Sequence, residues 1–124
     1  DVICNEMGAI NEELRRIAET ENATADEALR TDGRLHERYF RPVAERRLES
    51  TYSVLKAHTR RYTLAYGQLY LKYLETSVRD HERIIKHLRA GEPLMVEQAV
   101  RENYMNACER TKSAIKIERP RGAD

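Results

Sequence analysis

The chain has few of the residues that mark disulfide-stabilised or membrane proteins. Its 2 cysteines, Cys4 and Cys108, are far apart and form no Cys-x-x-Cys pair. This spacing fits isolated thiols in a reducing cytoplasm better than a disulfide framework, while a single long-range disulfide stays open. No apolar run approaches the roughly 18 residues that cross a bilayer, and the acidic-polar start does not resemble a signal peptide. We therefore predict a cytoplasmic protein without a membrane partner.

An excess of charge of one sign is also lacking. The 22 basic and 21 acidic residues nearly cancel, so the chain has no strong field to attract DNA or an acidic membrane. It has no glycine-rich phosphate loop and no recognisable pair of nucleophile and base. We therefore expect that this segment does not bind DNA by itself and is not an enzyme.

The residues that are abundant favour helices. With only 5 glycines and 3 prolines, and with 35% charged residues, the composition is typical of long amphipathic helices. Apolar residues make up 40% of the 124 positions, enough for one modest core and hence one domain.

The apolar residues recur every three or four positions, which is the helical period. Proline and glycine breaks and a Thr24 N-cap then divide the chain. The expected helices span about 2–21, 25–42, 43–67, 69–90 and 93–117. We predict an all-α fold, an antiparallel bundle of five to six helices with an internal ligand or metal cavity, since such bundles build their sites between helices.

One predicted helix carries a long stripe of mostly apolar and tyrosine side chains. It lies in the third helix and comprises Leu48, Tyr52, Leu55, Thr59, Tyr62 and Tyr66. The spacing is helical over five turns. With Tyr70 and Tyr73, which follow at near-helical spacing, the tyrosines of this stripe could line a moderately polar cavity, but the pattern favours core packing or a dimer face.

Three polar residues on apolar faces are candidates for chemistry. Asp32 and His36 are four residues apart, so a carboxylate and an imidazole share one helix face at a distance that one metal ion could bridge. His81 lies on another apolar stripe, where an unpaired imidazole would carry a desolvation cost. The alternative is a chance pair on a solvated helix together with a hydrogen-bonded core histidine.

These residues lie within runs that resemble a known family. The runs are DGRLH at 32–36, DHERIIKHLRAGEP at 80–93 and AVREN at 99–103. They are similar to the FCD domain, the C-terminal effector domain of the FadR branch of GntR-type bacterial transcription regulators. The family pattern runs D-x-x-[FL]-H, then E-H-x-x-I-x-x-A-[IL]-x-x-G-D, then A-x-x-x-[MV]-x-x-H.

The resemblance implies a metal site. Many members are all-α bundles whose cavity holds a divalent metal on one Asp and three His, and the metal helps to bind a small carboxylate effector. By position, Asp32, His36 and His81 are three of these ligands, and Asn103 stands in place of the fourth. An amide oxygen is a weaker donor than imidazole, so it lowers the affinity for zinc- or nickel-type ions. Asn103 therefore leaves open weak ligation, a water or effector at that position, or a metal-free pocket.

The resemblance also implies an effector clamp and a longer parent protein. Arg60, Arg61 and Tyr62 fall where such domains often point basic and hydroxyl groups at the effector carboxylate. The alternative is that they solvate the outer face of the helix. We expect the FCD-like domain over 1–117 and a disordered tail over 118–124, without the family's first helix and without its N-terminal winged-helix domain. DNA binding then belongs to that missing domain.

The sequence thus favours a non-enzymatic ligand-sensing domain that responds to a small organic acid and forms a homodimer. One alternative is a metal-dependent helical-bundle enzyme. Di-iron bundles need Glu-x-x-His motifs, however, and Glu82 follows His81 instead of preceding a histidine by three. A second alternative is a helical interaction module with no ligand, in which substitutions of His36 and His81 would affect stability alone.

Overall fold

The computed structural model describes residues 1–118, and these form six α-helices with no β-strand among them. This arrangement confirms the predicted all-α class. The helices are α1 (Val2–Ala18), α2 (Ala25–Phe40), α3 (Arg46–Ala65), α4 (Gly67–Lys72), α5 (Leu74–Ala90) and α6 (Pro93–Glu118). None of the described helices is long and apolar enough to cross a membrane. The tail expected over 118–124 begins at the last residue of α6 and otherwise lies outside the described residues.

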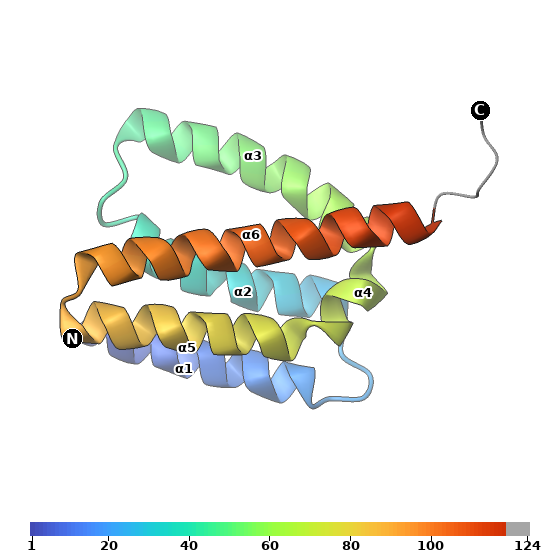
Figure 1. Cartoon of the computed structure of the whole chain (residues 1–124), viewed down its shortest axis with the longest axis horizontal. Coiled ribbons are helices and arrows are strands. Elements are labelled where there is room, and N and C mark those ends of the chain that lie inside the picture. The colour runs from blue at the N-terminus through green and yellow to red at the C-terminus, as the bar shows by residue number, and fades with distance from the viewer. Residues whose placement is uncertain (119–124) are drawn as a thin grey trace.

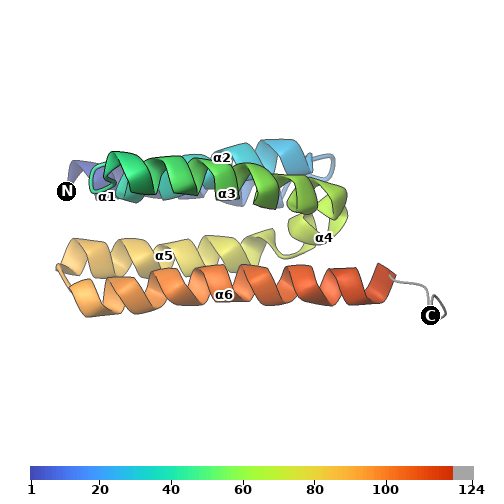
Figure 2. The ribbon, with the colours of Figure 1, turned by 90° about the horizontal axis from the view of Figure 1, so that it is seen from above.

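The helices form two layers joined at one end. Figure 2 shows α1, α2 and α3 in one layer, α5 and α6 in the other, and α4 connecting them. Helix α1 packs on both α2 and α5, and α5 packs on α6; Figure 1 shows α1 and α5 running side by side. The predicted fourth helix over 69–90 is in fact two helices, because the chain turns at Tyr73 between α4 and α5. Helix α3 ends at Ala65, and Gly67 begins α4 after the single linking residue Tyr66.

The helix ends follow from local chemistry. The Thr24 hydroxyl accepts a hydrogen bond from the Glu27 amide at 3.2 Å, so it caps α2 as predicted. Gly91 ends α5 in the left-handed conformation with φ 68°. Its amide donates to the Leu88 carbonyl, and the Glu92 amide donates to the His87 carbonyl. These two bonds are a Schellman motif, and Pro93 then starts α6.

The core lies between α1, α2 and α5. The predicted stripe of α1 is buried: Met7, Ile10, Leu14 and Ile17 are each at most 9% exposed. One apolar cluster includes Met7, Leu35 and Ile84, and a second includes Leu14, Ala28 and Val78. Each cluster therefore contains residues from both layers, and this packing fixes the distance between α2 and α5.

The stripe on α3 does not pack in the core, which excludes core packing as its use, while a dimer face stays a prediction. No residue of α3 is buried, and Leu48, Leu55 and Tyr62 are 51%, 60% and 55% exposed. Helix α3 lies at the edge of its layer and packs mainly on α2 and α4. Helical spacing shows which side chains share a face, but it does not show whether another helix covers that face.

Two glycines give a matched test of the packing. A Cβ atom at Gly67 would lie 2.7 Å from the Ala25 Cβ, whereas a Cβ at Gly8 would meet nothing within 4 Å. We expect Gly67→Ala to destabilise the fold by about 1–3 kcal/mol, because α4 must move away from α2. Gly8→Ala should stabilise it by about 0.5–1 kcal/mol through helix propensity. Urea unfolding measures both, and equal stabilities would contradict the close approach of α2 and α4.

Candidate metal centre

Three side chains meet between the two layers. Asp32 and His36 lie one turn apart on α2, and His81 comes from α5. The Asp32 Oδ1 lies 3.4 Å from the His81 Nε2, and its Oδ2 lies 3.6 Å from the His36 Nε2. One donor atom from each residue lies within 4.8 Å of the others. The prediction that these residues come together is confirmed, and the group could hold one metal ion.

Packing on both sides holds the group in place. On α2, Asp32 lies between Ala28 and Leu35 in the sequence, and on α5, His81 lies between Val78 and Ile84. All four flanking residues belong to the two apolar clusters. His81 is fully buried and the Asp32 side chain is 21% exposed. The site is therefore pre-formed by the core and does not depend on flexible loops.

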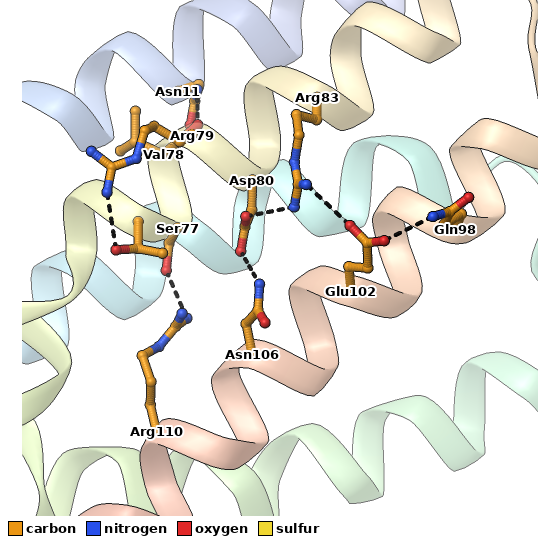
Figure 3. Close-up of polar contacts among 11 residues, drawn as sticks. Asn11, Ser77, Val78, Arg79, Asp80, Arg83, Gln98, Glu102, Asn106 and Arg110 are labelled. Atoms are coloured by element: carbon orange, nitrogen blue, oxygen red, sulfur yellow. Dashed lines mark hydrogen bonds and ion pairs between the residues drawn. The ribbon is translucent and has the colours of Figure 1, made fainter.

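A hydrogen-bond chain determines which His81 nitrogen carries the proton. The Asn11 amide donates from Nδ2 to the Val78 carbonyl at 3.0 Å, which turns the Asn11 Oδ1 toward the His81 Nδ1 at 3.1 Å (Figure 3 shows Asn11 beside Val78). An amide oxygen can only accept. The His81 Nδ1 must therefore donate, and the lone pair of a neutral His81 lies on Nε2.

That lone pair has no partner within the described structure. The His81 Nε2 is buried without a hydrogen bond, and the Asp32 Oδ1 that lies 3.4 Å from it is also an acceptor. Burial lowers the pKa of His81 to about 4, against the opposing effect of the Asp32 charge. The ring is thus neutral near pH 7. Two facing acceptors in a buried place are costly, and a cation bound between them would satisfy both.

His36 is oriented in a similar way. Its Nδ1 lies 2.6 Å from the Tyr39 hydroxyl, which leaves Nε2 on the side of Asp32. Burial raises the pKa of Tyr39 well above its ordinary value, so this hydroxyl stays protonated. Metal-binding histidines usually have such an outer partner on the second nitrogen. Both imidazoles therefore present an Nε2 to the same carboxylate.

Helix α6 covers one side of the group. The Tyr104 ring lies 5.3 Å from the His36 ring, centroid to centroid, and the preceding residue, Asn103, is 5% exposed. A seam of polar contacts, which Figure 3 shows, fixes α6 on α5. Its members are Ser77 with Arg110, Asp80 with Asn106 and Arg83, and Arg83 with Glu102. The role of Asn103 as a fourth ligand stays a prediction, as does the internal cavity.

Comparison with known families identifies the fold. The model of the FCD domain matches residues 1–105, which include Asp32, His36, His81 and Asn103. The chain belongs to the FCD family. FCD domains are the effector-binding domains of GntR/FadR-type regulators, and they are regulatory and not enzymatic. Searches of curated proteins and of solved structures found no significant match.

The predicted effector clamp lies elsewhere in this FCD domain. Arg60, Arg61 and Tyr62 are all exposed on α3, and Arg60 forms an ion pair with Asp26 of α2. The structure does not bring these three residues to the buried group, and their role in effector binding stays a prediction.

Sequence reasoning missed Asn11 and Arg110, and it had Tyr70 only as one of several tyrosines that could line a cavity. Asn11 left a visible signal, because it is a polar residue next to Ile10 on the apolar stripe of α1 and is 2% exposed. Tyr70 on α4 has a buried hydroxyl that makes no hydrogen bond of normal geometry and that lies near the Asp32 carboxylate. No spacing rule links either residue to His81, since they come from different helices.

Asn11 supplies a testable contact of this FCD domain. We expect Asn11→Leu to cost about 1–3 kcal/mol, because it leaves the buried His81 Nδ1–H without an acceptor. The neighbouring change Glu12→Leu serves as the control, since Glu12 is exposed and only pairs with Arg15 at the surface, where such pairs contribute little. Urea unfolding of both variants measures the difference. Equal stabilities would contradict the assigned His81–Asn11 bond.

Proposed function

We propose that this FCD domain senses a small organic acid through a divalent cation held by Asp32, His36 and His81. The observation that carries the proposal is the buried His81 Nε2 lone pair facing the Asp32 carboxylate at 3.4 Å. Two imidazole nitrogens and a carboxylate oxygen form a donor set that suits zinc- or nickel-type ions. When bound, such an ion supplies a Lewis-acidic position for an effector carboxylate.

The site can couple binding to the arrangement of the helices. Asp32 and His36 belong to one layer and His81 to the other, so shared ligation ties the layers together. A ligand changes the domain only by binding one arrangement more tightly than another. We propose that this difference is passed to a separate winged-helix domain that reads DNA, in a cytoplasmic homodimer.

The alternatives make different predictions. Membership of the FCD family favours sensing over a helical-bundle metalloenzyme. A ligand-free interaction module would bury the His81 Nε2 at a cost without any compensating partner. In that case, His81 substitutions would alter stability and no cation would bind.

Metal loading followed by thermal unfolding tests the proposal. The 124-residue chain is incubated with Zn²⁺ or Ni²⁺, dialysed, and analysed for bound metal by mass spectrometry. Its melting temperature is then measured with acetate, lactate, succinate and citrate. We expect one ion per chain and stabilisation by at least one carboxylate; a ligand at about 100 times its Kd adds about 2.7 kcal/mol.

Matched histidine variants locate the binding. His81→Ala should lose the ion, whereas His58→Ala should keep it, because His58 is exposed on α3. Absence of bound metal from the wild type, together with no stabilisation by any carboxylate, would contradict the proposal.

A further inference from the structure

Arg110 is a partly buried cation that forms no ion pair with the side chains that the structure describes. From α6 its Nη2 donates to the Ser77 hydroxyl on α5 at 3.3 Å, a contact that Figure 3 shows, and it forms no ion pair with any carboxylate of the described residues. Arg83 on the same seam differs, since it pairs with both Asp80 and Glu102. A guanidinium in a partly buried place normally has a carboxylate partner. The Arg110 charge is therefore available for a ligand.

This charge lies beside the candidate metal centre. Ser77 is one helical turn before His81 on α5, so Arg110 approaches the group from the α6 side. The same charge lowers the pKa of His81 and opposes the burial that raises the pKa of Tyr70. The Tyr70 hydroxyl is buried and makes no hydrogen bond of normal geometry, but it lies near the Asp32 carboxylate, whose charge and side-chain hydrogen bonding add to burial in raising the Tyr70 pKa. Two donors thus lie near the group: a guanidinium whose side-chain hydrogen bond goes to the Ser77 hydroxyl, and a phenol beside Asp32.

A count of charges shows what the site lacks. A bound divalent cation carries +2, Asp32 contributes −1 and Arg110 contributes +1, which leaves an excess of positive charge in a largely buried place. Asp80, Arg83 and Glu102 on the neighbouring seam are paired with one another and together carry a charge of −1, so an excess of one positive charge remains. Buried charge that is not compensated is costly. The loaded site therefore favours an anionic ligand placed between the cation and the guanidinium.

We propose that Arg110 and Tyr70 form an anion subsite beside the cation site and bind one carboxylate group of the effector. The guanidinium and the phenol hydroxyl donate to this carboxylate, and an oxygen of the effector binds the cation. This inference rests on the proposed function. It assigns the carboxylate contact to α6 and α4 in place of Arg60 and Arg61 on α3. The fitting ligands are small acids with one or two negative charges.

Cation and anion should then bind cooperatively. By linkage, a carboxylate that tightens cation binding is itself bound more tightly by the cation-loaded protein, and by the same factor. Removing the Arg110 charge has two opposite effects. It relieves repulsion of the cation when no anion is present, and it abolishes the main contact of the anion.

The experiment is a Co²⁺ titration of the whole chain, followed by its visible absorption, with and without succinate. Wild type, Arg110→Gln, Arg110→Lys and Tyr70→Phe are compared, with Arg61→Gln as the exposed control. We expect succinate to tighten Co²⁺ binding about tenfold or more in the wild type and in the control. In Arg110→Gln the effect of succinate should vanish, while Co²⁺ alone binds as tightly as before or more tightly.

The two remaining variants separate a direct contact from a structural role. Arg110→Lys keeps the charge but loses the forked donor, so it should keep part of the succinate effect. Tyr70→Phe should also lose part of it. Circular dichroism checks that each variant folds. If Arg110→Gln does not fold, the deciding comparison is a reduced succinate effect in Arg110→Lys beside a full effect in Arg61→Gln.

The experiment distinguishes failure of the anion subsite from failure of the proposed function. An undiminished succinate effect in Arg110→Gln, or its loss in Arg61→Gln, would overturn the anion subsite and leave the cation site standing. A wild type that binds no Co²⁺ would overturn the proposed function, and the subsite with it.

Discussion

Replacing Asp32 by asparagine should weaken divalent-cation binding by at least about 100-fold. Asp32 is the only charged ligand in the group of three. At an effective dielectric constant of about 20, two unit charges about 4 Å apart attract by about 4 kcal/mol, and every 1.4 kcal/mol corresponds to about tenfold in affinity. Isothermal titration calorimetry with Zn²⁺ measures the loss.

The same substitution should not harm the metal-free fold. The new amide can donate to the His81 Nε2, which has no partner in the wild type, so the stability should stay the same or rise by up to about 1 kcal/mol. Asp26→Asn is the matched control on α2, since Asp26 pairs with Arg30 and Arg60 at the surface. Equal cation affinities in the two variants would contradict the assignment of Asp32 as a ligand.

Acid should destabilise the metal-free chain through His81. Its pKa is lowered from 6.5 to about 4 in the folded protein, chiefly by burial. Between these pH values the unfolded state binds a proton at this histidine and the folded state does not, so stability falls as the pH falls. The contribution of neutral His81 to the free energy of unfolding is complete above pH 6.5 and is lost by about pH 4. A shift of this size amounts to on the order of 3 kcal/mol.

Comparison with a variant isolates this effect from other titrating groups. Urea unfolding is followed at several pH values for wild type, His81→Gln and His58→Gln. His81→Gln should lose less stability on acidification, by on the order of 3 kcal/mol, whereas His58→Gln should behave as the wild type because His58 is exposed. Parallel curves for all three proteins would contradict a neutral, buried His81.

Much of the architecture could be predicted because its determinants are local. The Thr24 cap, the Gly91 turn and the α1 stripe each depend on a few neighbouring residues. The break at Tyr73 could not be predicted, because the apolar period continues through it. The exposure of α3 could not be predicted either, since it depends on how the layers pack and not on the sequence of α3.

The candidate metal centre shows the same division. The Asp32 and His36 pair follows from helical spacing, the apolar stripe singles out His81 as an inward polar residue, and the resemblance to the FCD pattern joins the three as ligands. The outer contacts come from three other helices: Asn11 from α1, Tyr70 from α4 and Arg110 from α6. Only the fold brings these side chains near the group, so a pattern of single-helix spacings does not reveal them.

The central claim is that Asp32, His36 and His81 together bind one divalent cation. X-ray absorption spectroscopy of the Zn²⁺-loaded chain tests it most directly, because imidazole rings scatter in a recognisable pattern. The account predicts two imidazole nitrogens with oxygen donors completing the shell, and loss of one imidazole in His81→Ala. A shell of oxygen donors without imidazole, or a spectrum that His81→Ala leaves unchanged, would contradict it.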